Sequence, residues 1–191
     1  MNNIFKITGK VQHYAWGGLQ FIPNFLHQTN AENKPCAEYW LGAHPSAPSA
    51  INETKNLLEL IQENPTAVLG ERVYHQFKEL PYLFKILDVK DMLSIQVHPS
   101  KIEAEKGFDA EEVAGIAINA SNRNYKDRNH KPEVMVALSE FWLLHGFKVI
   151  SDIEKTLEDI LEFNVLFPLF RKEGLKSLYQ FLMEMPQEQV D

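Results

Sequence analysis

The sequence contains very little cysteine and no long hydrophobic run. Cys36 is the one cysteine among 191 residues, which excludes an internal disulfide framework and favours a reducing compartment. No apolar stretch reaches the roughly 20 residues of a transmembrane helix, and the start MNNIFKITGK has no signal-peptide core. These absences predict a cytoplasmic protein with no membrane partner, in which Cys36 acts as a small buried hydrophobe.

Positive charge is also scarce. The chain has 19 Lys and Arg against 26 Asp and Glu, a net charge of -7, and its basic residues form no long cluster. This balance argues against nucleic acid as the main partner. A small phosphorylated ligand stays possible, because a few local cations suffice to bind one phosphate.

The first 150 residues combine β patterns with short helical ones. Residues 56–70 have helical spacing, and Ser100 with Glu103 forms a capping-box pattern that predicts a short helix. The polar stretch 119–131 predicts a loop. Alternating or β-rich segments predict strands at 82–89, 92–97, 132–138 and 140–149, with a hairpin turn between the first two.

A helical pattern replaces the β pattern after residue 150. Ser151 and Glu154 predict a helix start, the apolar spacing continues to Met185, and Pro186 ends it. Residues 186–190 look like the first turn of one more helix. We therefore expect a β domain at 1–150 and, at 151–191, the beginning of a helical domain that is incomplete.

Two polar groups stand out within the β pattern. On a strand, Ser94, Gln96 and His98 share one face at spacings of about 7 Å, and Glu133 opens the strand expected at 132–138. Each group alone also fits a solvated strand face. If the strands are neighbours, Gln96, His98 and Glu133 supply three ligands, the number typical of a catalytic zinc site.

Four motifs in order resemble the type I mannose-6-phosphate isomerase family. They are YAWGG at 14–18, EYWLGAHPSAPS at 38–49, QVHP at 96–99 and NHKPE at 129–133. The resemblance implies a mainly β fold, a cupin-type jelly roll with short helices, followed by an α-helical domain. It also implies one Zn²⁺ per chain, with Gln96, His98 and Glu133 as ligands and the polar strand face inside the barrel.

The same resemblance implies the reaction and its partners. The family interconverts mannose 6-phosphate and fructose 6-phosphate, so the expected partner is a small sugar phosphate. Lys131 is expected to act in proton transfer or phosphate binding, and Ser94 and Trp16 to contact substrate. A fourth zinc ligand, a histidine, and a catalytic arginine of the family correspond to positions after residue 191.

Because the fourth zinc ligand and the arginine of the family are not among these 191 residues, we also consider other functions. One alternative is a non-catalytic cupin module that binds a metal or a sugar phosphate, which metal binding without turnover would favour. An iron-dependent cupin oxygenase usually needs more histidines, and a helix-mediated interaction protein fits only the last forty residues. A truncated β domain also predicts self-association through exposed sheet edges.

Overall fold

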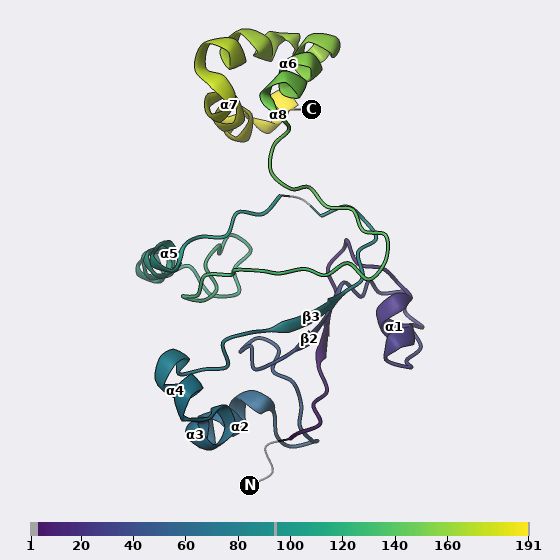
Figure 1. Ribbon diagram of the computed structural model, residues 1–191, viewed down its shortest axis with the longest axis vertical. Helices are drawn as coiled ribbons and strands as arrows, with labels where there is room; N and C mark the ends of the chain where they lie inside the picture. The colour runs from purple at the N-terminus through teal and green to yellow at the C-terminus, as the bar shows by residue number, and fades with distance from the viewer. Residues whose placement is uncertain (1–3, 94, 191) are drawn as a thin grey trace. The chain divides into compact units, whose positions relative to one another are not determined.

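The computed structural model describes residues 4–93 and 95–190, which form two units (Figure 1). The division lies between Leu144 and His145. Ser94, one of the expected substrate contacts, lies outside the described residues. Each unit has a hydrophobic cluster of its own.

A three-stranded antiparallel sheet organises the first unit. Its strands are β1 (Lys10–Gln12), β2 (Glu38–Leu41) and β3 (Phe84–Leu87), with β2 in the centre. The register places Trp40 opposite Lys85 on β3. The central strand β2 thus pairs with both neighbours through its backbone, and the neighbour β3 places the charged Lys85 opposite Trp40.

The apolar side of this sheet forms the core of the first unit. Ile22 from α1 (Phe21–Phe25) packs with Cys36 and Tyr39, and all three side chains are buried. The prediction that Cys36 is a buried hydrophobe is confirmed. Partly buried side chains complete the cluster: Val11, Leu26, Leu41 and Ile86.

Two helices of the first unit begin at residues whose side chains cap them. Asn56 and Glu59 form a reciprocal capping box at the start of α2. Ser100 accepts the Glu103 N–H at 3.3 Å and is the N-cap of α5, so the helix start predicted there is confirmed. The helices of this unit after α1 are α2 (Leu57–Glu63), α3 (Pro65–Leu69), α4 (Glu71–Phe77) and α5 (Lys101–Val113).

The second unit is helical, as the pattern after residue 150 predicts. Its elements are α6 (Ile150–Asp159), the 3-10 helix η1 (Leu161–Leu166), α7 (Phe167–Glu184) and α8 (Gln187–Val190). Its core consists of Leu157, Leu166, Phe170 and Leu178. The predicted cap at Ser151 is wrong, because Val149 is the N-cap and Ser151 lies inside α6. Gly174, at φ 79°, kinks α7.

Three of the four predicted strands are absent. Residues 92–97, 132–138 and 140–149 are irregular among the described residues, and an isolated parallel bridge from Leu93 to Leu143 replaces the hairpin. A strand needs partners for its backbone groups along its whole length, and in the described part of the chain these segments pair with one another only at this bridge, where the Leu144 N–H donates to the Leu93 carbonyl at 3.2 Å. Their apolar side chains stay exposed, at 93% for Val134 and 87% for Leu138. The expected mainly β domain is therefore confirmed only as one small sheet accompanied by helices.

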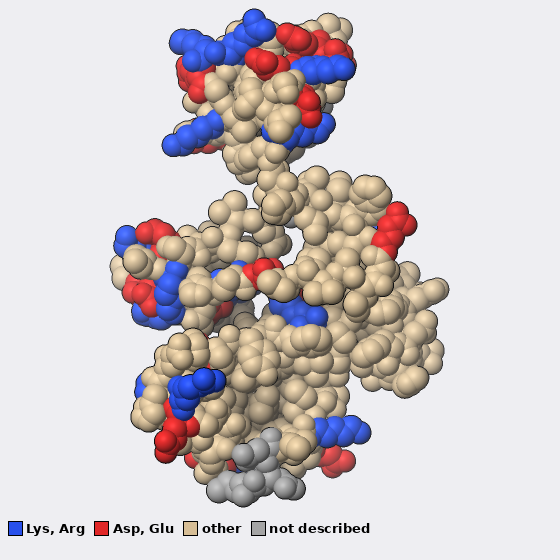
Figure 2. All heavy atoms as spheres, in the orientation of Figure 1, with Lys and Arg blue, Asp and Glu red and all other residues tan. Residues whose placement is uncertain are grey.

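Charges of both signs are interspersed on the surface. In Figure 2, basic and acidic side chains lie side by side over α5 and over the helices of the second unit. Such a mixed face lacks the continuous positive patch that attracts nucleic acid. Within 4–93 and 95–190, no helix is long and apolar enough to cross a bilayer.

Candidate metal and substrate site

His98 and Glu133 lie side by side although 34 other residues separate them in the sequence. His98 Nε2 is 3.7 Å from Glu133 Oε2, and both side chains are partly exposed. His98 precedes the Pro99-Ser100 start of α5, and Glu133 follows the loop after that helix. The structure thus brings together one residue from each of the two motifs QVHP and NHKPE.

Lys85 connects this pair to the sheet. Its Nζ lies 3.6 Å from Glu133 Oε1 and 3.8 Å from Glu38 Oε1. Glu38 is nearly buried on the central strand and accepts a 2.6 Å hydrogen bond from Trp40 Nε1. The cross-strand register therefore fixes a cation between two carboxylates, beside the ring of Trp40.

His44, which follows the central strand, lies within electrostatic range of Lys131. The His44 ring meets Trp40 edge-on with centroids 4.9 Å apart. Burial lowers the pKa of His44 below its ordinary value of 6.5; Asp127 opposes this shift, whereas Lys131 and Lys85 reinforce it. Lys131 Nζ itself lies 3.8 Å from Asp127 Oδ2. The charges of two ammonium groups, Lys85 and Lys131, thus act on one imidazole.

The pair His98–Glu133 has dimensions that suit a zinc ion. Two ligand atoms at about 2.0–2.1 Å from one zinc lie about 3.3 Å apart at the tetrahedral angle. The observed 3.7 Å separation needs only a small adjustment to reach that value. Imidazole nitrogen and carboxylate oxygen are both common zinc donors. No group of three His, Cys, Asp or Glu in the described residues could hold a metal, so further ligands must be of another type or come from elsewhere.

Two other expected site residues, Gln96 and Trp16, form no hydrogen bond or ion pair with His98 or Glu133 within the described residues. Gln96 has an exposed side chain on the irregular segment before His98 and is not hydrogen-bonded to His98 or Glu133 in the described part of the chain. Trp16 stacks on Tyr14 at 5.7 Å. Burial, and after it the charge of Glu38, raises the pKa of Tyr14. The aromatic pair is thus near the Glu38 end of the site.

Sequence reasoning missed Lys85 as a site residue. The segment YLFKILDV contains one charged side chain amid apolar neighbours before Asp88, which is a signal for a paired cation. Its partners Glu38 and Glu133 lie 47 and 48 positions away, so only the strand pairing reveals them.

Comparison with known proteins gives the family of this chain. Residues 4–150 match the family described as phosphomannose isomerase type I, catalytic domain. The chain belongs to the type I phosphomannose isomerase family. The match spans both motifs that supply the pair His98 and Glu133.

Relatives of known name support this membership. The chain is 41% identical to mannose-6-phosphate isomerase of Salmonella typhimurium (strain LT2), over 96% of this chain and 49% of the relative. The apo crystal structure from Salmonella typhimurium has a TM-score of 0.80 at 38% identity, with 99% of this chain and 49% of that chain covered. A structure from that organism bound to fructose 6-phosphate and zinc has a TM-score of 0.77 at 38% identity, with coverage of 97% and 49%. The chain therefore spans about half the length of the phosphomannose isomerases that it matches.

Proposed function

We propose that the protein carrying this chain is a zinc-dependent isomerase that interconverts mannose 6-phosphate and fructose 6-phosphate. The observation that carries the proposal is the 3.7 Å approach of His98 to Glu133 within a chain of the phosphomannose isomerase family. A similar protein has been crystallised with fructose 6-phosphate and zinc. The function is thus an aldose–ketose conversion at a metal site.

In this proposal His98, Glu133 and Gln96 hold one Zn²⁺ per chain. Nitrogen and oxygen donors of these types suit zinc, and the exposed side chain of Gln96 is free to turn toward the pair. When bound, zinc supplies Lewis acidity, which favours the negative charge that develops on the sugar's carbonyl oxygen. Water or a distant residue completes the coordination.

Lys131 is the residue to which we assign proton transfer. The conversion moves one proton from C2 of the open-chain aldose to C1, while a second proton passes from O2 to O1, so no oxidant is consumed. A side chain that relays protons at such a centre must reach the reacting carbon and oxygen atoms. Lys131 precedes Glu133 by two residues in the same loop, which supports this position.

Lys85, Trp16 and Ser94 complete the proposed substrate site. The ammonium of Lys85 offers a positive charge beside Glu133 for the anionic part of the substrate. The indole of Trp16 offers an apolar face for the sugar ring. Ser94 offers a hydroxyl next to the ligand segment.

The finer features of the fold and its setting are also proposals. We infer a cupin-type jelly roll for the domain at 1–150, to which the observed sheet contributes three strands, and the beginning of a helical domain at 151–191. We place the protein in the cytoplasm, in keeping with its single cysteine. We also expect the chain to self-associate through its exposed apolar segments, including Val134 and Leu138.

The proposed function is tested by measuring conversion of mannose 6-phosphate with and without a chelator. We expect activity in the zinc-loaded protein, its loss on chelation and its recovery when zinc is added back. Turnover that resists chelation would contradict the role of zinc. Zinc binding without turnover would favour the binding-module alternative and contradict the proposed reaction.

A further inference from the structure

Helix α5 directly joins the two halves of the proposed metal site. Lys101 is its first residue, three positions after His98. The loop that follows the helix returns the chain to Asn129 and Glu133. The placement of His98 relative to Glu133 therefore depends on how this loop is attached to α5.

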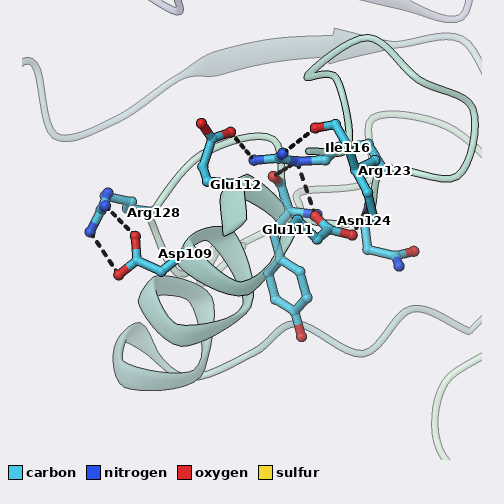
Figure 3. A network of polar contacts seen from close by, with 8 residues as sticks. Asp109, Glu111, Glu112, Ile116, Arg123, Asn124 and Arg128 are labelled. Atoms are coloured by element: carbon cyan, nitrogen blue, oxygen red, sulfur yellow. Dashed lines mark hydrogen bonds and ion pairs between the residues drawn. The ribbon is translucent and has the colours of Figure 1, made fainter. Parts of the chain in front are cut away.

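Arg123 attaches the first part of this loop to the C-terminal end of α5. Its side chain is completely buried, and its Nε lies 3.0 Å from Glu111 Oε2 on α5. Nη2 donates to Glu112 Oε1 at 2.8 Å and Nη1 to the Ile116 carbonyl at 2.6 Å, as Figure 3 shows. Because the guanidinium is planar and always charged, these bonds hold the loop in one orientation.

Lys101 attaches the far end. Its Nζ donates to the Arg128 carbonyl at 3.0 Å and to Asn129 Oδ1 at 2.8 Å. Asn129 is further fixed by Asp127, which accepts its backbone N–H at 2.8 Å. Hydrogen bonds from a charged donor are stronger than neutral ones. Lys101 is therefore a strong link from α5 to Asn129 itself, while Arg128, the residue before it, pairs through both Nη atoms with Asp109 of α5 (Figure 3).

We infer that Lys101 is a positioning residue for the metal site: it holds the loop so that Glu133 meets His98. Lys101 contacts neither residue, and it acts through Asn129 and the four-residue step to Glu133. The inference deepens the proposed function and rests on it for the identity of the ion. The first residue of α5 would thus hold the QVHP and NHKPE motifs in a fixed relative position.

The first test compares Lys101→Met with Lys106→Met in the full chain. Lys106 is a matched control on the same helix, since it pairs with Glu103 at 3.1 Å and not with the loop. Zinc affinity is measured by competition with a chromophoric chelator. We expect Lys101→Met to weaken zinc binding about tenfold, the low end for outer-shell partners, and Lys106→Met to leave it unchanged.

A second readout needs no metal. Amide hydrogen exchange of residues 127–133 reports local opening of the loop. We expect faster exchange there in Lys101→Met than in Lys106→Met, and restoration of both readouts in Lys101→Arg, which keeps the charge.

Each result decides one claim. Equal exchange and equal zinc affinity in the two methionine variants would overturn the positioning role. A wild-type protein that binds no zinc would contradict the proposed function instead, and the exchange comparison would still decide whether Lys101 holds the loop.

Discussion

Glu133 is shared between two partners of different chemistry. One carboxylate oxygen faces the His98 imidazole at 3.7 Å and the other faces the Lys85 ammonium at 3.6 Å. In the proposed site, the first contact would let the two side chains hold a cation between nitrogen and oxygen, and the Lys85 ammonium would balance the remaining carboxylate charge. A single carboxylate can thus link the metal to the sheet.

Lys131 is predicted to act in the reaction and not in metal binding. We expect Lys131→Met to lower the turnover of mannose 6-phosphate by about 10²–10⁴-fold, the usual contribution of a general acid or base. Zinc affinity should stay at the wild-type value, because Lys131 has no lone pair to offer while protonated.

The control for this prediction is Lys126→Met, an exposed lysine of the same loop. Kinetics and zinc titration are carried out on all three proteins. Equal turnover in Lys131→Met and Lys126→Met would remove Lys131 from the catalytic role.

Glu111 is predicted to make stability depend on acid pH. Burial alone would raise its pKa, but the N–H groups of Asn124 and Tyr125, together with Arg123, outweigh burial and lower the pKa below 4.5. A carboxyl with a lowered pKa in the folded state stabilises the fold above its unfolded pKa and loses that effect as pH falls through the folded value. The free energy of unfolding should therefore decrease as the pH falls below about 4.5.

The variants Glu111→Gln and Glu112→Gln separate this effect from general acid denaturation. Urea denaturation at several pH values between 6 and 3 gives, for each protein, the slope of the free energy of unfolding against pH. We expect the slope to be smaller in Glu111→Gln and unchanged in Glu112→Gln, whose side chain is more exposed. The same slope in both variants would contradict the assignment.

At the scale of elements, the sequence predicted helices better than strands. The caps at Asn56 and Ser100 lie next to the residues they bond, so local pattern suffices to place α2 and α5. The strands expected at 132–138 and 140–149 needed a partner strand along their length, and the described residues supply only the single bridge from Leu143 to Leu93. Periodicity identifies a face but cannot provide the neighbouring strand.

In the candidate site, too, residues in local motifs could be predicted and residues placed by long-range pairing could not. His98 and Glu133 could be selected from their motifs, since each lies in a short recognisable segment. Lys85 could not, because its pairing with Glu38 depends on the register between β2 and β3. Long-range pairing is the part of the site that sequence pattern leaves undetermined.

For the substitution Gly107→Ala in helix α5, packing and helix propensity predict opposite effects on stability. A Cβ at Gly107 would overlap the ring of Tyr125, which lies on the loop that Arg123 holds. Propensity alone predicts that Gly107→Ala stabilises the helix by about 1 kcal/mol. Overpacking predicts a net loss of about 1 kcal/mol or more, and we expect the loss.

Combining Gly107→Ala with Tyr125→Ala identifies the cause. Once the ring is removed, the same alanine should raise the midpoint of urea denaturation relative to Tyr125→Ala alone. A stabilising effect of Gly107→Ala with Tyr125 present would contradict the packing described for this helix.

At the scale of the whole molecule, the exposed segment 132–144 predicts self-association. Val136 is 74% exposed and Leu138 87%, within a stretch of exposed apolar side chains in which the described residues form no strand. Such a segment readily pairs with another copy. We expect light scattering to give a mass above the 22.0 kDa of the monomer, increasing with concentration.

Lysine substitutions test this prediction locally. Val136→Lys together with Leu138→Lys should lower the average mass, whereas Val113→Lys, at an equally exposed site on α5, should not. A wild-type chain that stays monomeric at all concentrations would contradict the prediction.

The most direct test of the central claim is a zinc competition titration of the wild-type chain and of His98→Ala and Glu133→Gln. Glu140→Gln, an exposed glutamate outside the site, is the control. If one ion binds between the two motifs, wild type and control should bind one zinc per chain. Each site variant should then lose more affinity than the about 100-fold typical of the largest outer-shell effects. Wild-type affinity in either site variant would show that His98 and Glu133 do not form the metal site.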